Sequence, residues 1–243
     1  MTSQNTDRLH QLGLSGMATA LDRQRGLPAF MGLGFDERLA TLIDAESSAR
    51  EDRRLKRILK LAKLKTQAMP EDIDFRNGRG LDRAMVADLL TCDWIERGRN
   101  GIITGPCGAG KTWLTCALGM QAARNGFPVL YHRVSLLLEA MALAHQDGSI
   151  SKLRATLAKA RLLILDDFGL ARFSPRGKQD LLEILDARVG AQSTIIAGQL
   201  PFQDWHDHID EPALADAILD RIMHTSFRLE LTGESMRRLK SGD

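Results

Sequence analysis

The sequence of 243 residues is poor in cysteine, and it has no long apolar run. The three cysteines, Cys92, Cys107 and Cys116, form no C-x-x-C pair, which excludes a disulfide framework or a cysteine-based zinc site and favours a reducing compartment. No run approaches the roughly 18 consecutive apolar residues that a membrane span requires, and the polar stretch 1–10 lacks the apolar core of a secretory signal. We therefore expect a cytoplasmic protein with no membrane partner.

Net charge and aromatic content are also low. The chain has 33 Lys and Arg against 31 Asp and Glu, a net charge of +2, so any affinity for nucleic acid must come from local clusters of cations. Aromatic residues make up 5% of the chain, too few to indicate a stacking platform for single-stranded bases. Apolar residues make up 44%, which is enough for a packed core.

The strongest motif is an octapeptide that fits G-x-x-x-x-G-K-[ST] at every fixed position. It consists of Gly105, Pro106, Cys107, Gly108, Ala109, Gly110, Lys111 and Thr112. The apolar run 101–104 precedes it and an amphipathic stretch beginning at Trp113 follows, which is the strand, loop and helix context of a phosphate-binding loop. Glycines let successive backbone N–H groups converge on one phosphate chain, and the helix adds the positive end of its dipole. We expect these residues, with Trp113, to bind ATP.

A second motif, the apolar run 162–165 followed by Asp166 and Asp167, supplies the acidic half of such a site. We expect Lys111 to reach the β- and γ-phosphates, and Thr112 and Asp166 to hold a Mg²⁺ ion. Asp167 is then placed to orient or deprotonate the attacking water. A strand that ends in an acidic cap of the next element has the same local pattern, but phosphoryl transfer needs a metal-holding acid near the phosphate loop.

The chain divides into two regions of different character. Residues 1–69 are rich in helix formers and are broken at Gly26-Leu27-Pro28 and Gly32-Leu33-Gly34, which predicts a small all-helical N-terminal domain. Residues 70–243 alternate strands with helices, which predicts an α/β domain with a mostly parallel sheet flanked by helices and a ligand at the carboxyl ends of its strands. The expected strands are 101–104, 128–132, 161–167 and 193–197, and the expected helices are 84–98, 134–144, 150–160 and 176–189.

The last helix of the N-terminal region is strongly basic. Eight cations lie between residues 50 and 65, against Glu51 and Asp52, in a chain of nearly balanced charge. A solvated helix face is one explanation, and a stripe that contacts phosphates is the other. The residues that we expect to contact DNA are Arg53, Arg54, Arg57 and Lys60 here, and Lys152 and Arg154 in a later helix.

Together these motifs resemble the initiator and helicase-loader group of AAA+ ATPases, and most closely the IstB-type transposition helper proteins. The segments that carry the closer resemblance are 162–170, 193–201, 214–222 and 233–237. The resemblance implies a P-loop AAA+ domain without a separate lid. It also implies that Gln199 is the polar sensor, Arg221 the arginine finger for a neighbouring subunit, and Arg237 the second sensor. Gly198 departs from the pattern, because a serine or another small polar residue is expected there.

The resemblance further implies a function. Such proteins assemble as homo-oligomers on duplex DNA with little sequence preference, hydrolyse ATP, and recruit and stimulate a partner transposase. One alternative is a DnaC-like helicase loader that binds single-stranded DNA. Another is a nucleotide-gated binding module with negligible turnover, because Gly198 is unusual and Asp167 stands where many AAA+ proteins use glutamate.

Overall fold

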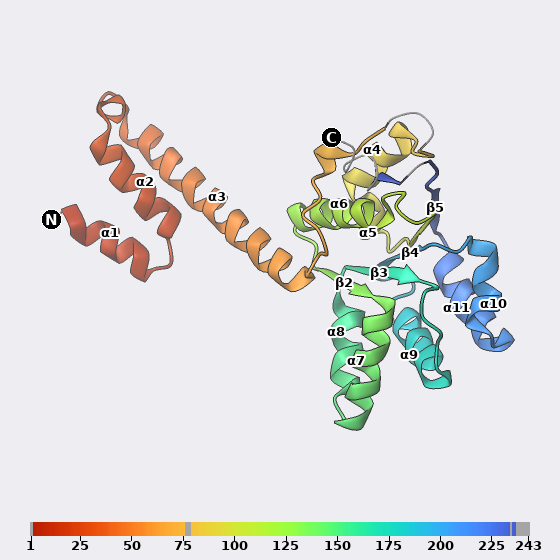
Figure 1. Cartoon of the computed structure of the whole chain (residues 1–243). Helices are drawn as coiled ribbons and strands as arrows, with labels where there is room; N and C mark the ends of the chain where they lie inside the picture. Colours follow the sequence, from red (N-terminus) through yellow and green to blue (C-terminus); the bar gives the residue numbers. More distant parts are fainter. Residues whose placement is uncertain (1, 76–78, 234, 237–243) are drawn as a thin grey trace. The chain divides into compact units, whose positions relative to one another are not determined.

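The computed structural model describes residues 2–75, 79–233 and 235–236, and the chain packs as two compact units, residues 1–57 and 58–243 (Figure 1). The division by packing falls inside helix α3 (Phe35–Ala62), whereas the sequence places the domain boundary between residues 69 and 70. Ile58 and Ala62, at the end of α3, are buried and belong to the second unit.

The first unit consists of helices joined by turns. Its elements are α1 (Thr2–Gln11), α2 (Ser15–Gly26), the 3₁₀ helix η1 (Pro28–Phe30) and most of α3. The helix breaks at Gly26-Leu27-Pro28 and before Phe35 lie where the glycines and the proline predict them. Among the described residues of this unit, Ala18 is the buried apolar side chain, while Thr6, Gln24 and Glu46 are buried polar ones. Polar contacts therefore contribute much of the internal packing of this unit.

The second unit is built on a five-stranded parallel sheet with the strand order β2-β3-β4-β1-β5. The strands are β1 (Gly101–Thr104), β2 (Val129–Arg133), β3 (Leu162–Phe168), β4 (Ser193–Gly198) and β5 (Phe227–Glu230). The apolar runs that predict β1, β3 and β4 are buried almost throughout, as parallel strands covered on both faces should be. Strand β5 was not expected from the sequence, because it has four residues that alternate between buried and exposed at the sheet edge.

Helices cover both faces of the sheet (Figure 1). Helix α6 (Lys111–Arg124) packs against β2, β3 and β4, while α7 (Val134–Gln146) packs against β2 and β3 from the other side. On the side of α7, the apolar core includes Leu163, Leu165, Phe168 and Trp205. The remaining elements are η2 (Pro70–Asp72), α4 (Arg83–Thr91), α5 (Asp93–Glu96), α8 (Ile150–Lys159), α9 (Pro175–Asp186), η3 (Phe202–Asp204), α10 (Trp205–Ile209) and α11 (Pro212–Met223). Within the described ranges, no helix combines the length and apolar character needed to cross a bilayer.

The expected single helix over residues 84–98 is in fact two helices, α4 and α5. Cys92 lies between them with a φ angle of 69°, and its N–H donates to the carbonyl of Leu89 at 3.3 Å. A left-handed residue cannot continue a right-handed helix, so the chain turns at Cys92 and directs Trp94 into the core.

Candidate nucleotide-binding site

The glycine-rich loop lies between the carboxyl end of β1 and the start of α6. Gly105, Gly108 and Gly110 have positive φ angles of 144°, 83° and 97°, which glycine adopts without strain. A Cβ atom at Gly105 would lie 2.3 Å from the carbonyl oxygen of Leu231, and one at Gly110 would lie 2.8 Å from the guanidinium of Arg79. The glycines are therefore required both by the turn and by the segments that pack closely against the loop.

The other predicted residues of the loop occupy distinct positions around it. Pro106 and Cys107 are exposed at its tip, Ala109 is buried, and Trp113 is half-buried in the first turn of α6. Because α6 begins at Lys111, the positive end of its dipole and its free N–H groups point towards the loop. This arrangement is a ready anion-binding site.

Lys111 folds back over the loop. Its Nζ donates to the carbonyl oxygens of Gly105 at 2.7 Å and Pro106 at 2.9 Å, and the side chain is buried. The ammonium group is thus already held among the backbone groups that would surround a phosphate chain. Exchanging these carbonyl contacts for phosphate oxygens requires little movement.

Asp166 lies next to the first turn of α6, within hydrogen-bond distance of Thr112. Its Oδ2 accepts hydrogen bonds from the hydroxyl groups of Thr112 at 2.7 Å and Tyr131 at 2.6 Å, and the residue is fully buried. Its Oδ1 is also buried but has no hydrogen-bond partner among the residues that the structure describes. Burying a carboxylate oxygen without a hydrogen-bond donor is costly. This atom is therefore available to coordinate a metal ion or to accept a hydrogen bond from a water of that ion.

This donor set fits Mg²⁺. The described residues contain no group of three or more His, Cys, Asp or Glu side chains that could enclose a metal ion. Mg²⁺ does not need such a cage, because it retains several waters and is usually held by one or two protein oxygens together with substrate phosphates. The hydroxyl of Thr112 and the carboxylate of Asp166 are oxygens of this kind.

Thr112 and Asp166 meet although their strands are not neighbours. Strand β4 lies between β1 and β3, so the two strands are about 10 Å apart. The loop and the first turn of α6 cross over the end of β4 and bring Thr112 to Asp166. The sequence predicts both residues and strand β4, while the position of β4 between β1 and β3 is visible only in the structure.

Asp167 follows at an irregular position of β3. Its φ angle is 60°, and the register between β3 and β4 shifts between Leu165 and Phe168. The left-handed conformation turns its side chain out of the regular alternation of the strand. The carboxylate is partly exposed and lies 3.6 Å from Nε of Arg133, so it is ion-paired at the edge of the site.

Gly198 and Gln199 stand at the end of β4, between the two motifs. A Cβ atom at residue 198 would lie 2.8 Å from the carbonyl oxygen of Phe168 and 3.3 Å from the ring of Trp205. The departure from the family's pattern at Gly198 thus has a structural reason, because the irregular end of β3 takes up the space of a side chain. Gln199 is half-buried at the carboxyl edge of the sheet, where the other predicted groups lie.

Two segments that are distant in sequence also contact the phosphate loop. The sequence does not indicate the first, whereas the second includes Met236 of the 233–237 motif. Arg79, expected to lie in a linker, donates from its guanidinium to the carbonyl of Ala109 at 2.9 Å. The segment after β5 crosses the loop as well, because the N–H of Met236 donates to the carbonyl of Gly108 at 3.0 Å. The N–H of Thr232 donates in turn to the carbonyl of Arg79 at 3.1 Å. No local pattern could reveal contacts between residues so distant in sequence.

Arg221 lies at the amino ends of the parallel strands, whereas the phosphate loop lies at their carboxyl ends. Its carbonyl accepts from Asn100, which directly precedes β1, whereas the loop follows the other end of that strand. Its guanidinium donates to Asp186 at 3.0 Å, and both side chains are partly exposed. Arg221 therefore cannot reach the phosphate loop of its own chain. Arg237, the predicted second sensor, lies outside the described residues.

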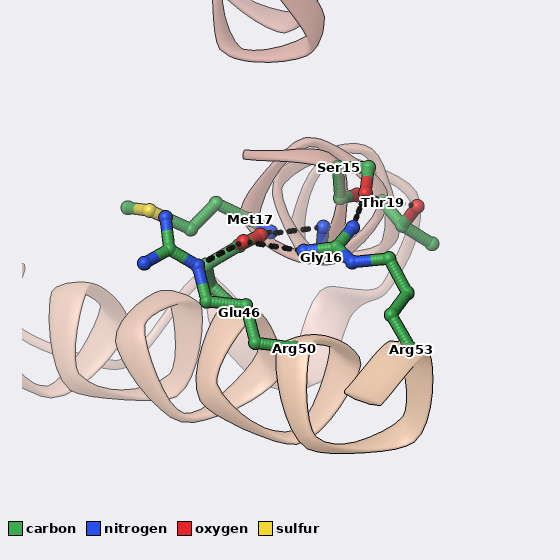
Figure 2. Close-up of polar contacts among 7 residues, drawn as sticks. All are labelled: Ser15, Gly16, Met17, Thr19, Glu46, Arg50 and Arg53. Carbon is green, nitrogen blue, oxygen red and sulfur yellow. Dashed lines mark hydrogen bonds and ion pairs between the residues drawn. The ribbon is translucent and has the colours of Figure 1, made fainter. Parts of the chain in front are cut away.

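The predicted DNA-contacting cations of α3 differ in their surroundings. Arg53 donates to a carboxylate oxygen of Glu46 at 2.9 Å and also contacts the hydroxyl of Ser15 (Figure 2). Arg54, Arg57 and Lys60 are exposed. Arg53 thus has a structural partner that a run of charges in the sequence does not reveal.

The second predicted cluster divides in the same way. Lys152 is exposed on α8, whereas Arg154 forms ion pairs with the buried Asp180 and with Glu183, both on α9. His145 on α7 shares Asp180 at 3.0 Å. Asp180 of α9 therefore joins Arg154 of α8 and His145 of α7, and Lys152 is the member of the predicted pair that is exposed to a ligand.

Comparisons with known proteins assign the chain to a family. The profile of the family described as IstB-like ATP binding protein matches residues 7–242. An insertion sequence ATP-binding protein of Sinorhizobium fredii is 47% identical over 232 residues, which cover 96% of this chain and 95% of the relative. The ATP-binding protein of insertion sequence IS1162 from Pseudomonas fluorescens is 50% identical over 202 residues, which cover 83% of this chain and 87% of the relative.

Solved structures support the fold. The DnaC helicase loader matches with a TM-score of 0.58 at 19% identity, over 70% of this chain and 100% of that one. The replication initiator DnaA bound to AMPPCP and single-stranded DNA matches with a TM-score of 0.58 at 21% identity, over 74% of this chain and 56% of that one. The predicted P-loop AAA+ fold is thus confirmed, and the chain belongs to the IstB-like ATP-binding protein family.

Proposed function

We propose that this protein is an ATPase of DNA transposition, which binds ATP with Mg²⁺ at the phosphate loop and uses the nucleotide to control assembly on duplex DNA. One observation carries the proposal: Thr112 and the buried Asp166 meet beneath a glycine-rich loop, and Oδ1 of Asp166 is left unsatisfied by the described residues. The association with transposition rests on relatives that are named as ATP-binding proteins of insertion sequences.

The residues divide the chemistry among them. The loop N–H groups and Lys111 would bind the phosphates, and Thr112 and Asp166 would hold Mg²⁺, whose positive charge would offset the negative charge of the phosphates. Asp167 exchanges its ion pair with Arg133 for the attacking water and orients it. Gln199, at the same edge of the sheet, donates to that water or to the γ-phosphate.

Arg221 completes the site of a neighbouring subunit. Its place at the amino ends of the strands supports action in trans. Because the ion pair with Asp186 is exposed, breaking it to bind a phosphate would cost little free energy. ATP hydrolysis then depends on assembly, which makes the nucleotide a timer for the DNA-bound oligomer. Arg237 is the proposed second sensor.

The exposed cations supply the contacts with the DNA backbone. In the first unit these are Arg54 and Arg57, and in the second they are Lys60 and Lys152. Arg53 and Arg154 contribute less, because each already neutralises a buried carboxylate. Contacts with phosphates alone give little sequence preference, and target choice is left to a partner transposase.

Nucleotide binding is tested first with Lys111→Ala. The variant should lose affinity for a fluorescent ATP analogue, whereas Lys159→Ala, which removes an exposed lysine of α8, should keep it.

The site in trans is tested with Arg221→Ala. This variant should bind the analogue normally but lose ATP turnover on DNA. Its control is Arg99→Ala, also at the amino ends of the strands. Normal turnover of Arg221→Ala would exclude the site in trans.

DNA binding is tested with a duplex and a single strand of equal length, each with ATP, with ADP and without nucleotide. Cooperative binding to the duplex that requires ATP supports the proposal. Binding confined to the single strand would instead assign the protein to helicase loading.

The cations are tested by neutralising Arg54 and Arg57 together. The slope of log affinity against log salt concentration should become shallower by about 2, because each phosphate contact contributes about one unit.

A further inference from the structure

The tyrosine of β2 contacts the acidic residue of the site. Tyr131 is the one tyrosine of the sequence, and it is buried on the strand that pairs with β3. Its hydroxyl donates to Oδ2 of Asp166 at 2.6 Å, which is the oxygen that also accepts from Thr112. All described donors to this carboxylate therefore converge on one oxygen, and Oδ1 is left without a partner.

The tyrosine can serve the carboxylate without also binding the metal ion. Tyr131 lies on β2, outside both motifs, and its hydroxyl donates to Oδ2 of Asp166. Thr112, by contrast, must take a place on the metal ion as well, so its hydroxyl has two roles.

A carboxylate needs this restraint because rotation about its terminal bond is soft. The terminal torsion of aspartate is broad and roughly two-fold, so its two oxygens exchange places easily. A second donor on the same oxygen restrains the rotation and leaves the other oxygen available to a ligand. Outer partners of this kind orient metal ligands, and their loss typically lowers metal affinity about 10–100-fold.

We propose that Tyr131 is a positioning residue for the magnesium site, whose hydroxyl holds Oδ2 of Asp166 so that Oδ1 faces the metal ion or its water. The proposal rests on the proposed function of the phosphate loop. It gives the neighbouring strand β2 a direct role in metal binding, which neither motif of the sequence indicates.

The test is Tyr131→Phe, which removes the hydroxyl and keeps the ring. Affinity for a fluorescent ADP analogue is measured in EDTA and across a Mg²⁺ titration. In EDTA the variant should bind within about twofold of the unmodified protein, and its Mg²⁺ midpoint should rise about tenfold or more. A midpoint within about twofold of the unmodified protein would overturn the proposal.

A matched control separates loss of metal binding from loss of stability. Thr194→Val removes another buried hydroxyl of the same sheet, one that accepts from the buried Arg188 at 2.9 Å, at the end of β4 remote from the loop. It should lower the melting temperature and leave the Mg²⁺ midpoint unchanged. If Thr194→Val raised the midpoint as much as Tyr131→Phe, the effect would be general and the proposal would fail.

A double variant tests whether Tyr131 acts through Asp166. Tyr131→Phe should add nothing to the Mg²⁺ midpoint of Asp166→Asn, because the group to be positioned is already changed. Full additivity would assign the tyrosine another role. If the unmodified protein bound the analogue without any dependence on Mg²⁺, the proposed metal site would itself be wrong, whereas a Mg²⁺ dependence that Tyr131→Phe leaves intact refutes the positioning role alone.

Discussion

Two buried carboxylates, one in each unit of the chain, are bound in opposite ways. Both oxygens of Glu46 in α3 are used by the chain itself: one accepts from two N–H groups at the start of α2, and the other from two guanidinium groups of α3 (Figure 2). Asp166 in β3 accepts two hydroxyl donors on one oxygen and has no described partner on the other.

The difference separates a group that the fold satisfies from one that we propose to bind a ligand. A carboxylate whose acceptors are all occupied internally stabilises the packing around it, as Glu46 does between α2 and α3. A buried carboxylate with an unused oxygen is satisfied only when a ligand arrives, and the ligand-free fold bears that cost. Burial of a charged group alone does not distinguish the two, whereas the count of its donors does.

The largest expected effect is that of Asp166→Asn. The Mg²⁺ midpoint for binding of an ADP analogue should rise about 100-fold, because a ligand of the metal is lost. The nucleotide-free protein should become more stable by about 1 kcal/mol, because a buried charge with an unsatisfied oxygen is removed. Thermal unfolding would report this as a rise of about 2–4 °C. Asp207→Asn, at an exposed aspartate, is the control, and a lower melting temperature for Asp166→Asn would contradict the distinction.

The packing beside Glu46 is tested with Gly16→Ala. A Cβ atom there would lie 2.5 Å from the carbonyl oxygen of Ala45 and 2.7 Å from Cα of Glu46, so α2 has to move away from α3. We expect a loss of about 1–3 kcal/mol in the first unit, measured by hydrogen exchange of its amides. Gly26→Ala is the matched control, because nothing lies within 4 Å of its Cβ position. Equal exchange in the two variants would mean that the helices are not in close contact.

Glu46→Gln should affect the fold and leave the nucleotide site unchanged. The side chain can still accept from the N–H groups of α2, but it loses its charge interactions with Arg50 and Arg53. Hydrogen exchange in the first turn of α2 should accelerate, with nucleotide affinity unaltered. Glu51→Gln, at an exposed residue of the same helix, should alter neither quantity. A change in the Mg²⁺ midpoint of Glu46→Gln would show that Glu46 also affects the nucleotide site, and would contradict the comparison with Asp166.

The smallest effect is a dependence on acid pH. The ion pair with Arg50, aided by the N–H groups of α2 and by Arg53, lowers the pKa of Glu46 from 4.5 to about 2. A lowered carboxyl pKa stabilises the folded unit fully above pH 4.5, and this contribution is lost as the pH falls towards 2. Hydrogen exchange of residues 2–57 should therefore accelerate over that range more in the unmodified protein than in Glu46→Gln. Parallel curves would show that other carboxylates govern the transition.

The sequence could predict the parts of the site that local chemistry dictates. A phosphate loop needs glycine where the backbone turns, and the acidic residue must end a buried strand, so both motifs can be read from short segments. The same motifs led to the family and the fold, which the comparisons confirm. The roles of the individual site residues, from Lys111 and Asp166 to Arg221 and Arg237, remain predictions.

The remaining features depend on contacts between distant residues. The sequence treats Gly198 as a departure from a pattern, whereas the carbonyl of Phe168 on the neighbouring strand leaves no room for a side chain there. It likewise counts Arg53 as a free cation, although Glu46 and Ser15 already engage it. A contact of this kind arises only after two helices pack together, and no local pattern encodes it.

The solitary tyrosine also makes the protein convenient to observe. Biosynthetic replacement of tyrosine by 3-fluorotyrosine would place one fluorine nucleus in the whole chain, beside the carboxylate of Asp166. A fluorine spectrum would then contain a single resonance from the protein, free of any assignment problem. Its shift and width would report whether a metal ion binds beside Asp166 and how fast it exchanges, without any added label.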